Sequence, residues 1–178
     1  MIIPKKMHKL EDIKKRIVSI NDAQKKVSQW KGENQTIVFT NGCFDILHKG
    51  HVSYLFEAAS FGNKLVVGIN ADASVKRLNK GSDRPINEEN ARAFLIAALS
   101  CVALVVIFEE ETPKELIEKL SPNCLVKGGD YDANETNRES KKYIVGSEHV
   151  KKNGGEVKTI DLVEGFSSTS IINKMKSN

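Results

Sequence analysis

Two histidines three positions apart are the residues of this chain whose types and spacing best suit chemistry. His48 and His51 bracket Gly50, and in a helix this spacing puts both imidazoles on one side of the first turn. The free backbone N–H groups of a first turn, with the positive end of the helix dipole, form an anion site. A glycine beside the rings lets the backbone approach a ligand closely. Two hydrogen-bond donors at such a site suit the phosphates of a nucleotide.

Plainer interpretations of the histidine pair also exist. The two rings could be surface groups, or a hydrogen-bonded pair that caps a helix. A metal site is less favoured, because metal-binding histidines on a helix usually lie four positions apart beside an acidic partner. The preceding stretch favours phosphate binding, since an apolar run, a turn containing Gly42 and then Asp45 lead directly into the pair.

The elements that position the pair can be predicted from hydrophobic periodicity. Residues 37–39 are an apolar run typical of a buried strand, and apolar residues return at helical spacing from Val52 to Ala59. Later apolar runs predict strands, and apolar stripes predict helices. The predicted strands cover residues 64–69, 102–108, 124–126 and 156–160, and the predicted helices begin near Asn21, Glu88, Thr112, Tyr143 and Ser167. Strands that alternate with helices predict an α/β fold with one parallel sheet covered on both faces.

Composition divides the chain into a short arm and one domain. Residues 1–18 are rich in lysine and arginine and carry few apolar anchors, which predicts a basic, partly ordered N-terminal arm. Residues 19–178 are long enough to form a single domain with a full core. No internal repeat or second domain is visible in the sequence.

Charge and cysteine content exclude several classes of protein. The formal net charge of +4 suits a small anionic substrate and does not demand nucleic acid. No apolar run approaches the length of a membrane span, and the basic N-terminus lacks the apolar core of a signal peptide. The three cysteines, Cys43, Cys101 and Cys124, are too few and too scattered for a disulfide framework or a metal site. We therefore expect a cytoplasmic protein.

Polar residues follow several of the predicted strands. The carboxyl ends of parallel strands meet at one edge of a sheet, where open α/β folds bind ligands. We expect His48, His51, Asp72, residues 127–130 and residues 167–169 to gather there. By default a hydroxyl-rich helix start is a simple N-cap, and Lys127-Gly128-Gly129-Asp130 is a turn whose glycines allow a nucleotide to come close.

One stretch resembles a known superfamily. Asn41-Gly42-Cys43-Phe44-Asp45, followed by His48-Lys49-Gly50-His51, is similar to the H-x-G-H signature of the cytidylyltransferase-like nucleotidyltransferases. This resemblance implies a Rossmann-like α/β domain that joins a nucleoside triphosphate to a phosphorylated small molecule and releases pyrophosphate. It also implies that Ser167-Ser168-Thr169 is the second signature, a helix start that grips the triphosphate.

Finer matches narrow the resemblance to one group of enzymes. Residues 39–45, 67–70, 84–85, 126–131 and 154–157 resemble the adenylyltransferases that act on D-glycero-β-D-manno-heptose 1-phosphate. These enzymes make ADP-heptose, a precursor of bacterial lipopolysaccharide and surface glycans, and they occur alone or fused behind a sugar kinase. The likeness extends from about residue 19 to residue 175. It implies ATP and a phosphosugar as partners, with a separate kinase that supplies the phosphosugar; a homodimer is left open.

The resemblance also implies roles for individual residues. The reaction would be direct, in-line attack of a sugar-phosphate oxygen on the α-phosphorus of ATP, which depends on positioning and charge stabilisation. His48, His51 and Lys49 are the implied catalytic residues. Arg84 and Arg92 fit either a pyrophosphate contact or a surface ion pair. The implied nucleotide-binding and phosphate-binding residues are Thr40, Asn41, Gly42, Cys43, Phe44, Gly50, Lys127, Gly128, Asp130, Ser167, Ser168 and Thr169, and the implied substrate contacts are Asp45, Asn70, Asp72, Arg84, Arg92 and Tyr131.

Two properties of the predicted site concern charge. The resemblance implies Mg²⁺ that is carried by the triphosphate, without side-chain ligands. The protonation of His48 and His51 stays open, because the helix dipole opposes a proton on the rings whereas a bound triphosphate favours one.

One loop departs from the family pattern, and other functions remain as alternatives. Residues 132–142 form a longer and more polar loop than the family has, which puts the identity of the sugar in question. A polar loop without apolar anchors is expected to be mobile until a ligand orders it. Two interpretations stay open, a lid that closes over the phosphosugar and a loop that only decorates the surface. The nearest rival is a glycerol-3-phosphate cytidylyltransferase, which shares both signatures. A class I aminoacyl-tRNA synthetase is disfavoured, because 178 residues leave no room for a tRNA-binding domain. A non-catalytic nucleotide-binding module is the remaining alternative.

Overall fold

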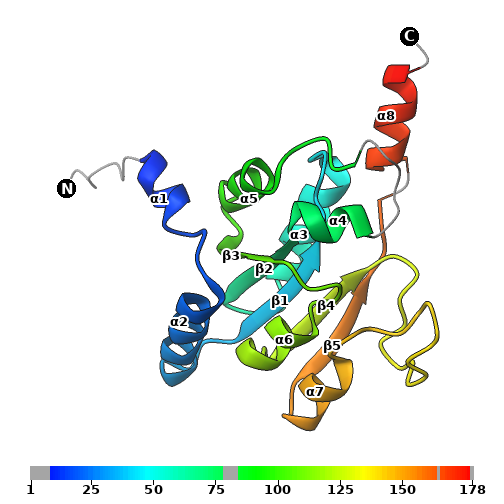
Figure 1. The fold of residues 1–178 in the computed structure, drawn as a ribbon. Helices are drawn as coiled ribbons and strands as arrows, with labels where there is room; N and C mark the ends of the chain where they lie inside the picture. The colour runs from blue at the N-terminus through cyan, green and yellow to red at the C-terminus, as the bar shows by residue number, and fades with distance from the viewer. Residues whose placement is uncertain (1–8, 78–83, 164, 177–178) are drawn as a thin grey trace.

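The computed structural model describes residues 9–77, 84–163 and 165–176. A five-stranded parallel sheet runs through the molecule in the order β3-β2-β1-β4-β5 (Figure 1). The strands are β1 (Ile37–Gly42), β2 (Lys64–Asn70), β3 (Val102–Phe108), β4 (Cys124–Gly128) and β5 (Glu156–Ile160). The helices are α1 (Leu10–Lys14), α2 (Ile20–Gly32), α3 (Lys49–Ala59), α4 (Asp72–Arg77), α5 (Glu89–Ala97), α6 (Lys114–Leu120), α7 (Ser147–Lys152) and α8 (Ser168–Lys176).

Helices cover both faces of the sheet, and each face has its own core. Apolar residues of α3 and α5 pack on one face, where Leu55 and Ile96 are fully buried. Apolar residues of α2, α6 and α7 pack on the other face, where Val27 and Leu116 belong to a second buried cluster with the strand side chains of that face. The predicted α/β class, with one parallel sheet covered on both faces, is confirmed.

Several predicted boundaries shift for local reasons. The predicted helix at 143–153 begins only at Ser147, because Gly146 stands before it with a φ of 87°, outside the helical region. The second helix starts earlier than predicted, since Ser19, not Asn21, accepts the backbone N–H of Asp22 as N-cap. Short helices α1 and α4 lie in segments for which no helix was predicted. Within the described segments, no helix has both the length and the apolar character needed to cross a bilayer.

Strands β1 and β4 are paired over a short distance. Their register joins Val38 to Cys124 and Phe39 to Leu125, whereas β1 pairs with β2 along its whole length. We call the unpaired part of the two strands beyond Phe39 and Leu125 the β1–β4 gap. The connections leave β1 toward β2 on one side and reach β4 on the other, so this gap is the switch point at which open α/β sheets bind ligands.

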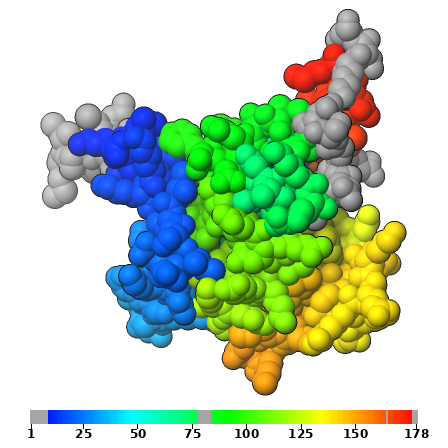
Figure 2. All heavy atoms as spheres, viewed as in Figure 1, coloured from blue at the N-terminus to red at the C-terminus, as the bar shows by residue number. Residues whose placement is uncertain are grey.

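The described part of the predicted N-terminal arm packs against the domain. The guanidinium of Arg16 donates hydrogen bonds of 3.0–3.2 Å to the carbonyls of Ala97, Leu99 and Val102, where α5 ends and β3 begins. Ile17 forms a parallel bridge with Val105, and α1 lies beside α5 (Figure 2). Residues 9–18 are therefore attached to the sheet, residues 1–8 lie outside the described part, and the domain boundary at residue 18 stays a prediction.

These contacts predict a stability effect that a solvated arm would not have. Replacing Arg16 with alanine should lower the free energy of unfolding by about 1–3 kcal/mol, because carbonyls at the α5–β3 junction lose their partner. Urea denaturation measures this change. The neighbouring exposed residue supplies the control: Lys15→Ala should change stability by less than about 0.5 kcal/mol. Equal effects of the two substitutions would mean that the segment does not support the domain.

Candidate active site

The two histidines lie at the start of α3, as their spacing predicts. His48 is the N-cap of this helix, and its Nδ1 accepts a hydrogen bond from the backbone N–H of His51 at 3.4 Å. The rings are stacked, with centroids 3.8 Å apart and planes 18° apart. Because an accepting Nδ1 carries no proton, the neutral His48 ring carries its proton on Nε2. The interpretation of His48 as a helix cap is therefore correct for Nδ1, and Nε2 remains available as a hydrogen-bond donor.

Both imidazoles are neutral near pH 7 in this ligand-free state. Burial, and to a smaller degree the neighbouring His48, lower the pKa of His51 to about 4, while the Ile46 carbonyl partly opposes this shift. Burial also lowers the pKa of His48. Each neutral ring still carries one N–H group, which can donate a hydrogen bond to a phosphate oxygen.

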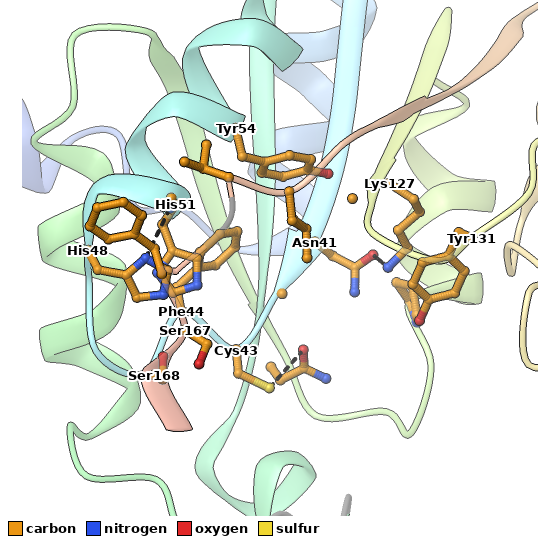
Figure 3. Close-up of a pocket in the computed structure, with 18 of the residues that line it drawn as sticks. Asn41, Cys43, Phe44, His48, His51, Tyr54, Lys127, Tyr131, Ser167 and Ser168 are labelled. Atoms are coloured by element: carbon orange, nitrogen blue, oxygen red, sulfur yellow. Dashed lines mark hydrogen bonds between the residues drawn. The ribbon is translucent and has the colours of Figure 1, made fainter. Parts of the chain in front are cut away.

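A cavity of about 580 Å³ opens beside the histidine pair. In Figure 3 the histidines, Ser167 and Ser168 lie at one side of it, and Asn41, Lys127 and Tyr131 lie at the other. The predicted residues that line it are Asn41, Gly42, Cys43, Phe44, His48, Gly50, His51, Asn70, Lys127, Gly128, Tyr131, Ser167 and Ser168. The structure thus brings together residues from the ends of β1, β2 and β4 and from the starts of α3 and α8.

The start of α8 faces the cavity with two serines. Ser167 Oγ accepts the backbone N–H of Ser170 at 3.0 Å, which is an N-cap contact. Ser168 Oγ donates to the Ile46 carbonyl at 3.4 Å and so ties α8 to the loop before His48. The third hydroxyl of the predicted signature, on Thr169, does not line the cavity and lies 3.5 Å from an Arg84 nitrogen.

Lys127 and Asn41 meet across the ends of β4 and β1. The ammonium of Lys127 donates to Asn41 Oδ1 at 2.7 Å and lies 5.3 Å from the centre of the Tyr131 ring. Since the amide oxygen of Asn41 is turned to the lysine, its NH₂ group is the part left to meet a ligand. Lys49, the third predicted catalytic residue, lies over the Phe166 ring at 5.4 Å and is not among the residues that line the cavity.

Asp45 differs from its predicted role as a substrate contact. Its carboxylate is buried and accepts the backbone N–H groups of Ile86 and Asn87 at 2.8 and 2.9 Å. Its second oxygen accepts from Arg84 at 2.9 Å. The group is fully used within the protein, so Asp45 holds residues 84–87 against the loop before α3, and the expectation of a substrate contact is corrected.

Arg92 is also placed differently from the prediction. The side chain is completely buried, and its guanidinium donates to the carbonyls of Cys43, Asn70 and Asn87 at 2.6–2.9 Å. It also pairs with Asp72 at 2.7 Å. A guanidinium with four protein partners inside the core is neither a surface ion-pair residue nor a pyrophosphate contact. It fixes the ends of β1 and β2 relative to α5.

The remaining predicted residues lie around the cavity without lining it. Thr40 is fully buried, so any contact with a nucleotide would have to come from its neighbours. Asp130 borders a second hollow with Tyr131, Asp132 and Lys142, beside the loop of residues 132–142. Among the residues that the structure describes, no group of three or more His, Cys, Asp or Glu side chains is arranged to hold a metal ion.

Some residues of the cavity were missed by sequence reasoning. They are Tyr54, Glu111, Thr112, Pro113, Tyr143, Val145, Leu162, Val163 and Phe166. Residues 111–113 and 162–163 follow β3 and β5, so the rule that placed the other strand ends at this edge could have found them. Tyr54 gave no such signal, because an aromatic residue inside a helical apolar stripe resembles ordinary core.

The low pKa of His51 predicts how stability depends on pH. The folded value of about 4 lies below the ordinary 6.5, so between these pH values the unfolded chain binds the proton and the folded chain does not. The stabilisation is complete above pH 6.5 and is lost as the pH falls toward 4. From about pH 7 to about pH 5, this group should remove about 2 kcal/mol from the free energy of unfolding.

Urea denaturation of the parent and of His51→Gln at both pH values measures this contribution. The variant should lose less stability than the parent on acidification, because its side chain does not titrate. Parallel losses in the two proteins would show that the ring is as accessible to protons in the fold as in the unfolded chain.

Comparisons with known proteins find one family and a group of similar sequences. The family profile described as Cytidylyltransferase-like matches residues 39–174. The bifunctional protein HldE of Nitrobacter hamburgensis is 52% identical over 88% of this chain and 30% of that protein. HldE of Actinobacillus pleuropneumoniae is 46% identical over 97% of this chain and 34% of that protein. The chain therefore spans about a third of the length of these curated relatives.

Solved structures share the fold. The lipopolysaccharide core biosynthesis protein of Thermoplasma volcanium aligns with a TM-score of 0.54 and 30% identity, covering 72% of this chain and 97% of that one. The pantoate-beta-alanine ligase of Francisella tularensis aligns with a TM-score of 0.56 at 15% identity, covering 91% of this chain and 78% of that one. At the latter identity the likeness concerns the fold alone.

Proposed function

Because this chain belongs to the cytidylyltransferase-like family, we propose that it transfers the adenylyl group of ATP to a sugar phosphate. The acceptor is D-glycero-β-D-manno-heptose 1-phosphate, and the products are ADP-heptose and pyrophosphate. Relatives named HldE at 46–56% identity and a structural relative named for lipopolysaccharide core biosynthesis support this acceptor. A sugar kinase reaction supplies the phosphosugar, and Mg²⁺ arrives with ATP.

The observation that carries the proposal is the meeting of two helix starts at one cavity. His48 and His51 at α3 and Ser167 and Ser168 at α8 line the same space (Figure 3). Each helix start offers backbone N–H groups and a positive dipole end. A triphosphate carries charge along several linked phosphates, so a site with two such ends suits it better than it suits a single phosphate.

The chemistry requires little proton transfer. The attacking phosphosugar oxygen is already anionic and the leaving pyrophosphate is a stable anion, so no general base is needed. What the site must supply is alignment and donors for the charge that develops on the α-phosphate oxygens. Neutral imidazoles meet that need, and the His48 cap fixes which nitrogen of that ring donates.

An assay of pyrophosphate release tests the function directly. The protein is mixed with Mg²⁺ and either ATP or CTP, together with heptose 1-phosphate or glycerol 3-phosphate. Release should be fastest with ATP and heptose 1-phosphate. Preference for CTP with glycerol 3-phosphate would transfer the assignment to the rival cytidylyltransferase, and no release in any pairing would contradict the proposal.

The catalytic role of His48 can be separated from its capping role. In His48→Asn the amide oxygen can replace the capping acceptor, but the Nε2 donor is lost. The fall in kcat/KM should correspond to a loss of roughly 2–4 kcal/mol of transition-state stabilisation, the range for a lost oxyanion donor. Thermal melting should stay within about 2 °C of the parent. If turnover of this variant remains near normal, the ring acts only as a cap.

Phosphate binding by the serines at the start of α8 can be tested with a control on the same helix. Ser168→Ala should weaken binding of a non-hydrolysable ATP analogue about tenfold, because a hydroxyl at the phosphate end of the cavity is lost. Ser170→Ala removes a hydroxyl that bonds only within the first turn and should leave the affinity within about twofold. Calorimetry measures both. An affinity of Ser168→Ala within about twofold of the parent would mean that Ser168 only ties α8 to the loop before His48.

A further inference from the structure

Side chains continue the β1–β4 pairing where the backbone ladder stops. The register joins Val38 to Cys124 and Phe39 to Leu125, so Thr40 and Val126 would form the next pair. Instead of bonding to each other, both bond to the hydroxyl of Tyr54, at 2.6 Å from Thr40 Oγ1 and 3.2 Å from the Val126 carbonyl.

The position after that is joined in the same way. Asn41 and Lys127 follow in register, and the Lys127 ammonium donates to Asn41 Oδ1 at 2.7 Å. Two consecutive rungs of the parallel ladder are thus replaced by side-chain bonds. The strands are held at a fixed separation at the point where the cavity begins, without closing on each other.

The Tyr54 hydrogen bonds have a defined direction. Its hydroxyl has one proton, which it donates to the Val126 carbonyl, so the Thr40 hydroxyl donates to the Tyr54 oxygen. Thr40 is fully buried and Tyr54 is 8% exposed. Burial also raises the pKa of Tyr54, which keeps the hydroxyl protonated. All three groups are satisfied only while this chain of bonds is intact.

Tyr54 also belongs to the helix that carries the histidines. It lies one turn after His51 and four positions after Gly50 on α3, so its side chain attaches the first turns of this helix to both strands. Its ring packs against the backbone of β4, where a Cβ added at Gly128 would lie 3.0 Å from Tyr54 Cε2. The ring and the hydroxyl therefore interlock α3, β1 and β4.

We propose that Tyr54 is a positioning residue, whose hydroxyl fixes the α3 histidines relative to the ends of β1 and β4. The inference rests on the proposed adenylyl transfer, in which His48 and His51 must meet the α-phosphate while Lys127 stays on the opposite side of the cavity. Tyr54 acts through these groups and takes no part in bond making or breaking.

Tyr54→Phe tests the proposal, because it keeps the ring and removes one oxygen. The Thr40 hydroxyl and the Val126 carbonyl lose their partner, and the strand ends and the first turns of α3 can shift. The value of kcat should fall about tenfold. KM for ATP should stay within about twofold of the parent, because the grip at α8 is untouched. Thr40→Val, which removes the bond from the strand side, should change kcat in the same direction.

A second measurement does not depend on the acceptor. The pKa of His51 in the ligand-free protein is low because the ring is buried, and a loosened first turn would admit water. NMR titration of the imidazoles should therefore show a higher His51 pKa in Tyr54→Phe than in the parent. This readout keeps its meaning if no sugar phosphate is turned over, so failure of the proposed function and failure of the positioning role can be told apart.

The matched control lies on the same helix. Ser60→Ala removes a hydroxyl that donates to the Glu57 carbonyl at 2.6 Å, at the end of α3 away from the cavity. It should leave both kcat and the His51 titration as in the parent. Parent-like kcat and titration in Tyr54→Phe would overturn the proposal, and so would a fall in melting temperature alone, since that would be a purely structural effect.

Discussion

Strands β1 and β4 pair through two residues of each strand and then continue, without pairing to each other, to the edge where the cavity lies. A parallel sheet gains backbone hydrogen bonds by staying paired, so a separation of this kind needs compensation. Tyr54 donates to the Val126 carbonyl that the ladder leaves open, and Lys127 joins the two strands by bonding to the Asn41 side chain. The cavity, the turn before α3 and the placement of the histidines all depend on this separation being held.

Buried polar groups support the same region from behind. Arg92 binds the carbonyls at the ends of β1 and β2, and Asp45 binds the backbone of residues 86–87. Both charges are buried, which is tolerable only because each has several hydrogen-bond partners. Such groups resemble catalytic residues in a sequence, since both kinds are charged. In this molecule Arg92 and Asp45 hold the surrounding backbone in place, and the neutral histidines, serines and amides line the cavity.

The features of the fold and site that can be predicted from the sequence depend on local patterns. The strand–turn–helix around His48 and His51 and the parallel sheet follow from periodicity and from the positions of glycine. Whether a polar side chain such as Asp45 or Arg92 points into the cavity or into the core depends on partners far away in the sequence, which no local pattern contains. The same holds for Tyr54, whose partners Thr40 and Val126 lie on different strands. The late start of α7 depends on the backbone conformation of Gly146, which the sequence does not show. The attachment of residues 9–18 depends on carbonyls far along the chain that accept hydrogen bonds from Arg16.

The proposed adenylyl transfer requires one triphosphate to lie between the starts of α3 and α8. A crystal structure of the protein with a non-hydrolysable ATP analogue, Mg²⁺ and heptose 1-phosphate tests it most directly. We expect α-phosphate oxygens within hydrogen-bond distance of His48 Nε2, and the outer phosphates at the α8 start beside Ser168. Phosphates bound elsewhere, for example in the hollow bordered by Asp130 and Lys142, would contradict it.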